Sequence, residues 1–191
     1  SPGVEDVVVA SDLVGCRYRL VQRRAHPEMP RTHASIARAE RHAAAVEAVM
    51  EMFPRKGSGR FRRIDLEGDE WERSMRTLEA LASGYTHITN AVFATEEWMV
   101  RVDLLLREGD KYTPIIVSNH RVARKNDAKT TLAVPTHRLG LSEPLEAPYK
   151  LRHHSVDGYR LAFAARALRD LGLDSGRGGA IGQDRTRAFF T

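Results

Sequence analysis

The sequence contains a single cysteine, Cys16, and this scarcity excludes several kinds of protein. One cysteine forms no disulfide within its own chain, so a reducing compartment, the cytoplasm, is the expected location. Iron–sulfur clusters are held by several cysteine thiolates, and therefore no iron–sulfur cluster is expected.

Long apolar runs are missing as well. No stretch approaches the roughly 20 apolar residues that a membrane-spanning helix needs, so no membrane partner is expected. Zinc-ligand spacing, a P-loop, a G-x-S-x-G motif and internal repeats are also absent from the sequence. The 191 residues, 42% hydrophobic and 29% charged, are typical of one globular domain, which we expect to span 1–191.

Acidic residues are outnumbered by basic ones, and this favours a polyanionic partner. Lysine and arginine total 30 against 25 aspartates and glutamates, which gives a net charge of +5 and a pI near 9.6. Most of the basic residues are arginines, whose planar guanidinium groups match phosphate oxygens. A GC-rich genome would produce the same arginine bias, so that alternative stays open.

Residues 121–148 form the least regular part of the sequence. They show neither helical nor strand periodicity, so an irregular basic segment is expected here. Four basic residues lie early in it: Arg121, Arg124, Lys125 and Lys129. They form either a solvated run of charge or a flap that closes over nucleic-acid phosphates.

Apolar periodicity and capping residues predict a short helix over 13–24 and three longer helices, over 34–53, 70–82 and 155–171. Asp69 is the expected N-cap of the second helix. The first helix has an apolar stripe at three- and four-residue steps, formed by Ile36, Ala39, Ala43, Val46, Met50 and Phe53. His42 lies beside this stripe, either as a half-exposed helix histidine or pointing towards a site at the edge of the core.

The central feature of the sequence is the stretch 91–123, whose pattern predicts two strands joined by a tight turn. Residues of its first strand alternate, with Trp98, Val100, Val102, Leu104 and Leu106 expected on one face and Arg101, Asp103, Leu105 and Arg107 on the other. Glu108-Gly109-Asp110 supplies the turn. Asp103 is unusual in this setting, because a buried carboxylate is costly unless it meets a cation, a hydrogen-bond donor or a metal. Ser118 and His120 follow the second strand on one face, so polar groups from two neighbouring strands are expected to converge.

This pattern resembles the RecB-like branch of the PD-(D/E)XK nuclease superfamily. The likeness rests on RVDLLLR around Asp103, on ARAERHAAAVEAV around His42, on DLVGCRYRL, and on DGYRLAFAARALRDLGLD followed by GGAIGQDR. It covers nearly all of the chain. Where the family carries (D/E)-x-K, this sequence has Ser118-Asn119-His120. The implied fold is α/β with a restriction-endonuclease-like core, in which a central mixed sheet is built on an antiparallel hairpin with flanking helices.

The resemblance also implies a site and a chemistry. His42 and Asp103 correspond to metal ligands, Ser118 stands where a second carboxylate is expected, and His120 stands in place of the lysine. The implied cofactor is a divalent metal, Mn²⁺ or Mg²⁺, and imidazole donors favour Mn²⁺. An Asp–His pair that only stabilises the hairpin is the alternative reading of the same residues.

Three functions are compatible with these observations. The first is a metal-dependent, Mn-preferring DNase that acts in DNA repair or recombination. The second is a catalytically inactive protein of the same fold that binds DNA through Arg121, Arg124, Lys125 and Lys129. The third is a protein-interaction subunit of a repair complex. DNA is the expected partner in the first two cases.

Overall fold

The computed structural model describes residues 8–9, 32–54, 61–63, 68–152 and 155–191. Cys16 and the short helix predicted over 13–24 lie outside the described residues. Within them, nine strands form one mixed sheet in the order β2-β3-β4-β5-β10-β11-β7-β8, with β1 added beside β4. The protein is therefore a mixed α/β protein whose sheet is mostly antiparallel. None of the described helices is both long enough and apolar enough to cross a membrane.

The centre of the sheet is an antiparallel meander of three strands, β3 (His87–Ala94), β4 (Trp98–Glu108) and β5 (Lys111–Val117). The strand β10 (Gly179–Ile181) lies parallel to β5, and β11 (Arg187–Phe190) then pairs antiparallel with β10. On the outer side of β3, the short strand β2 (Phe61–Arg63) pairs in parallel. The two residues of β1 (Val8–Val9) pair in parallel with the start of β4.

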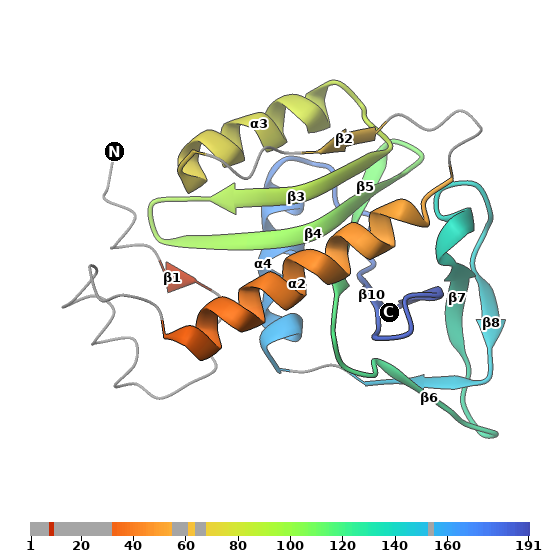
Figure 1. Ribbon diagram of the computed structural model, residues 1–191. Coiled ribbons are helices and arrows are strands. Elements are labelled where there is room, and N and C mark those ends of the chain that lie inside the picture. The colour runs from red at the N-terminus through yellow and green to blue at the C-terminus, as the bar shows by residue number, and fades with distance from the viewer. Residues whose placement is uncertain (1–7, 10–31, 55–60, 64–67, 153–154) are drawn as a thin grey trace.

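Within the described residues, three α-helices cover the sheet. In Figure 1, α2 (His33–Glu51) crosses the front of the central strands and α4 (Ser155–Asp170) lies behind them. The third helix, α3 (Glu70–Ala82), packs with β3 and contributes to the same buried cluster as α4. Asp69 is the N-cap of α3, as predicted, since its carboxylate accepts a 2.9 Å hydrogen bond from the Glu72 amide.

The buried stripe of α2 differs from the predicted one. Val46 and Phe53 are buried as expected, but Ile36 is 41% exposed, and Ala45 and Val49 take the remaining inner positions. The described contacts of α2 with the sheet core come from its C-terminal half, so an apolar residue in the first half is not required to face inward. His42 precedes Ala45 by one turn and therefore continues the inner stripe rather than lying beside it.

The β4–β5 hairpin has the predicted position, but β4 does not keep one face inward along its whole length. Trp98, Val100 and Val102 pack in the cluster that contains α3 and α4. Leu104 and Leu106 pack instead in the cluster that contains α2. The prediction that these five residues share one face was wrong, because β4 exchanges its two faces between Val102 and Leu104.

The exchange of faces occurs where the β3–β4 ladder is interrupted. Thr89 pairs with Leu104 and Ala91 pairs with Val102, whereas Asn90 and Asp103 between them are not paired. Asn90 has a φ of 56°, in the left-handed region that asparagine tolerates better than most residues. Asp103 therefore lies at a break in the sheet, which period-two reasoning does not anticipate.

Residues 121–148 are more ordered than their sequence indicated. They contain the strands β6 (Ala123–Lys125), β7 (Thr131–Pro135) and β8 (Leu145–Ala147), and a 3-10 turn, η3 (Thr136–Arg138). β7 joins β11 in the main sheet, and β6 pairs with β9 (Tyr149–Leu151) in a separate two-stranded sheet. Strands of three to five residues are too short to show a clear period, which explains why the sequence predicted an irregular segment.

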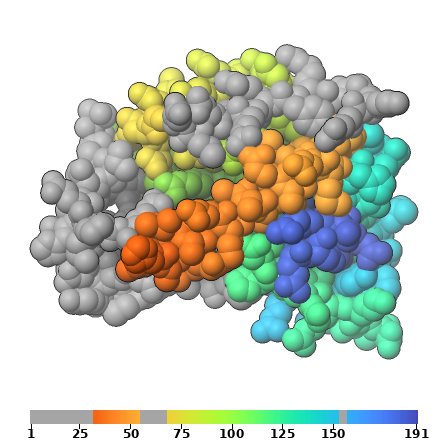
Figure 2. All heavy atoms as spheres, in the orientation of Figure 1, coloured from red at the N-terminus to blue at the C-terminus, as the bar shows by residue number. Residues whose placement is uncertain are grey.

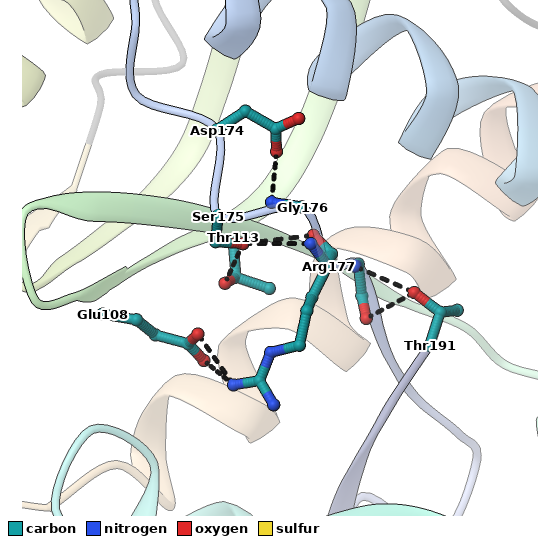
Figure 3. A network of polar contacts seen from close by, with 8 residues as sticks. Glu108, Thr113, Asp174, Ser175, Gly176, Arg177 and Thr191 are labelled. Carbon is teal, nitrogen blue, oxygen red and sulfur yellow. Dashed lines mark hydrogen bonds and ion pairs between the residues drawn. The ribbon is translucent and has the colours of Figure 1, made fainter.

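A polar network holds the loop after α4 against the hairpin (Figure 3). One Arg177 nitrogen, Nη2, lies 2.7 Å from both carboxylate oxygens of Glu108, and the Arg177 guanidinium also lies over the Phe190 ring at 4.9 Å. Thr113 and Ser175 share a hydrogen bond of 2.7 Å between their hydroxyl groups. These contacts position the chain immediately before β10 and so help to align β10 with β5.

Candidate functional site

Asp103 occupies a fork between β4 and β5. The β4–β5 ladder ends at the pair Leu104 and Ile115, and beyond this pair β5 remains paired only with β10. In place of a strand partner, the Val117 amide donates a 2.7 Å hydrogen bond to Oδ2 of Asp103. The carboxylate thereby closes the gap between the two strands, and only 5% of the residue is exposed.

Two side chains from separate helices meet the other oxygen of Asp103. His42 of α2 lies with its Nε2 atom 2.7 Å from Oδ1. Arg160 of α4 donates through Nη2 to the same oxygen at 3.3 Å and through Nε to the Arg101 carbonyl at 3.0 Å. Asp103, His42 and Arg160 are called the carboxylate cluster below. Because α2 and α4 cover opposite faces, the break in the sheet is what allows one carboxylate to reach both.

The surroundings of Asp103 stabilise its charged form. Burial by itself would raise the pKa of this carboxyl group, since a charge is poorly solvated in the core. The charge of Arg160, the hydrogen bond and charge of His42, and the Val117 amide outweigh burial, so the pKa lies below its ordinary value. Arg160 also lies 3.7 Å from Asp157, one turn earlier on α4, so two carboxylates share its positive charge.

The carboxylate cluster does not fit a divalent metal as it is arranged. Mg²⁺ and Mn²⁺ favour several oxygen donors, whereas this position offers one carboxylate and one imidazole. The guanidinium of Arg160 already lies against the carboxylate, and a second cation there would be repelled. Among the described residues, no group of three or more His, Cys, Asp or Glu side chains is arranged to hold a metal ion.

Ser118 and His120 follow the fork at the end of β5. Ser118 is buried, its amide donates to the Ile181 carbonyl at 2.8 Å, and its hydroxyl accepts from the His120 amide at 3.1 Å. This local turn orients the chain as it leaves the sheet. The His120 residue is exposed, and its backbone carbonyl accepts from the Gln183 amide at 3.0 Å. Of the predicted site residues, His42 and Asp103 are therefore in direct contact, and Ser118 follows the residue whose amide binds Asp103.

The predicted basic residues surround a cavity rather than forming a detached loop. A cavity of about 580 Å³ lies beyond the ends of β5 and β10, and it is called the basic cavity here. It is lined by Arg121, Val122, Ala123, Arg124, Lys125, Tyr149, Gly182, Gln183, Asp184 and Phe189. Three of the four predicted nucleic-acid contacts are therefore among its lining residues. Lys129 is in the turn between β6 and β7, where its amide binds the Asn126 side chain.

Figure 2 shows the face that α2 crosses, with the C-terminal residues in blue beside the helix and the green segment that follows β5 next to them. The basic cavity takes its lining from these two parts of the chain and from β9. It therefore depends on the pairing of β6 with β9 and of β7 with β11.

The fold and the site together define a mixed α/β protein with a buried, charge-balanced carboxylate and a separate cavity rich in basic residues. Comparison of the chain with protein-family models, with curated proteins and with solved structures gave no match.

Sequence reasoning missed two parts of the site. Arg160 was not named as the partner of Asp103, although an arginine within the otherwise apolar helical stretch YRLAFAA was an available signal. Tyr149 and Phe189 were not associated with the basic residues. Strand pairing between distant segments brings them there, so no local sequence pattern could have identified them.

Proposed function

We propose that this protein binds nucleic acid through the basic cavity, and that its core is a PD-(D/E)XK, RecB-like nuclease core in which Asp103 has a structural role. The order of helices and strands supports the proposed nuclease core. A helix, a second helix, three antiparallel strands, a helix and a strand occur in this order as α2, α3, β3 to β5, α4 and β10, with β2 inserted after α2 and β6 to β9 inserted after β5. His42 and Asp103, the residues that the resemblance pairs, also lie in contact.

The observation that carries the proposal is the concentration of positive charge around the basic cavity. Arg124 lines the cavity and lies directly opposite Lys150 in the antiparallel pair of β6 and β9, although Lys150 itself is not a lining residue. Like charges at such positions repel each other and destabilise a sheet, so an anion between them would relieve the repulsion. Arg121 and Lys125 add two further exposed cations, against one carboxylate, Asp184. A polyanion such as a nucleic-acid backbone fits this distribution.

Affinity as a function of salt tests the proposal. Each phosphate contact releases counterions, so affinity for labelled DNA should fall steeply between about 50 and 200 mM salt. The variant Arg124→Gln/Lys125→Gln should bind more weakly and reduce the slope of log affinity against log salt by about one for each lost contact. Arg166→Gln/Arg169→Gln on α4 removes two exposed charges outside the cavity and is the matched control. An affinity that does not depend on salt, or an equal loss in the control, would refute the proposal.

A metal-dependent DNase is the second candidate; the carboxylate cluster as arranged does not fit a divalent metal, but one contact favours this function. The imidazole of His42 and the carboxylate of Asp103 are 2.7 Å apart, although they lie 61 residues apart in the sequence. If this pair serves catalysis, Asp103→Ala should abolish cleavage of linear DNA in Mn²⁺ by a protein that remains folded. Unchanged cleavage by that variant would exclude Asp103 from any nuclease activity found.

A further inference from the structure

The floor of the basic cavity is apolar and aromatic, which a phosphate backbone alone does not explain. Val122, Ala123 and Phe189 line it and are buried, together with the partly buried Tyr149, whereas the charged lining residues are exposed. The rings of Tyr149 and Phe189 are 5.1 Å apart and tilted by 58°. Phosphate groups are strongly hydrated and gain nothing from contact with such a surface, whereas the flat face of a nucleobase is stabilised by stacking on it.

Tyr149 is held in place by contacts on both sides of its strand. Its carbonyl accepts a 2.7 Å hydrogen bond from the Thr131 hydroxyl, and the preceding Pro148 carbonyl accepts from the Asn126 amide at 2.9 Å. The Arg187 guanidinium lies 5.4 Å from the centre of the ring and also donates to its hydroxyl. The Tyr149 ring is thus partly exposed and held in place by Phe189 and, at its hydroxyl, by Arg187, so it does not have to be ordered on binding.

We infer that the basic cavity binds single-stranded nucleic acid by taking an unpaired base against Tyr149, while Arg121, Arg124 and Lys125 contact the neighbouring phosphates. This inference rests on the proposed function and specifies its substrate. In a duplex both faces of each base are already stacked, so only a single strand or a strand end presents a base to the ring. A volume of about 580 Å³ lies within the range of small-ligand pockets, which is about 300–1,000 Å³.

The test compares oligothymidine of about 16 nucleotides with a duplex of the same length, each fluorescently labelled, by anisotropy with the full chain. The wild type should bind the single strand more tightly than the duplex. Tyr149→Leu keeps an apolar side chain at the contact with Phe189 but removes the aromatic face. It should weaken single-strand binding by about 5- to 150-fold, the equivalent of the ~1–3 kcal/mol that one stacked base contributes. Duplex binding should be unchanged within a factor of about two, since it depends on phosphate contacts.

Two further variants separate stacking from other roles of the residue. Tyr149→Phe keeps the ring and loses only the hydroxyl that Arg187 binds, so it should retain single-strand affinity. Tyr159 on α4 is 43% exposed and does not line the cavity, so Tyr159→Leu is the matched control and should have no effect. Thermal unfolding of each variant confirms that it is folded before binding is compared.

The possible outcomes distinguish the inference from the function on which it rests. If neither probe binds, the proposed function itself fails. If both probes bind with similar affinity, or if Tyr149→Leu weakens them equally or not at all, the function stands and the base-stacking platform is refuted. A loss confined to the single strand, rescued in Tyr149→Phe, supports the inference.

Discussion

The substitution Arg160→Met tests whether the carboxylate cluster is a structural unit. It removes the guanidinium from Asp103, which is 5% exposed, and leaves the Arg101 carbonyl without its donor. Removal of one partner from a buried ion pair typically costs about 3–5 kcal/mol, because the remaining charge stays buried. That is a large part of the about 5–15 kcal/mol that stabilises a typical domain.

Substitution of the other partner, Asp103, should reduce the free energy of unfolding by less. Asp103→Asn preserves the shape of the side chain, and Arg160 then keeps Asp157 as a partner 3.7 Å away. We expect a loss of about 1–3 kcal/mol, the range for a buried hydrogen-bonding group deprived of its partner. The double variant should lose less than the sum of the single losses, with a coupling of about 0.5–3 kcal/mol, since it leaves no unpaired buried anion.

Urea unfolding of the four proteins measures these free energies. Arg101→Met is the matched control, because the Arg101 side chain is 43% exposed and pairs with Glu70 at the surface. Surface ion pairs contribute about 0–1 kcal/mol, so this variant should lose at most that much. Additivity of the Asp103 and Arg160 variants within about 0.5 kcal/mol, or a loss at Arg160 no larger than in the control, would refute the argument.

Three other predictions follow from the described contacts. Burial lowers the pKa of His87 from 6.5 to about 4, and the hydrogen bond to the Leu139 carbonyl opposes this only in part, so the folded state disfavours the charged imidazole. The free energy of unfolding should therefore be full above about pH 6.5 and fall by about 3 kcal/mol towards pH 4. His87→Asn should flatten this part of the pH profile. Asp103 has a lowered pKa, so its contribution to the free energy of unfolding is present above about pH 3.9 and is lost as the pH falls further. Asp103→Asn should therefore reduce the loss of stability that urea unfolding measures below that pH. Calorimetric titration should show no Mn²⁺ binding at Asp103, since the Arg160 guanidinium already pairs with that carboxylate. Mn²⁺ binding that is present in the wild type and lost in Asp103→Asn would instead favour the DNase.

The local elements of this protein are encoded in short stretches of sequence. The α3 helix was predictable to its bounds, because Asp69 is a good N-cap and apolar residues recur at helical spacing. The hairpin was also predictable, since alternating residues and a Glu-Gly-Asp turn are signals within a few positions of one another. The need of Asp103 for a partner was likewise evident from the cost of burying a carboxylate.

The tertiary structure decided which partners these residues have. Arg160 reaches Asp103 from 57 positions away, and only because the sheet opens between β4 and β5 and β4 exchanges its faces. Tyr149 and Phe189 meet the basic residues through the pairing of strands that are too short to show a period. A sequence specifies helices and turns through neighbouring residues, whereas a site depends on contacts between segments that are distant along the chain, and these exist only after the whole sheet has formed.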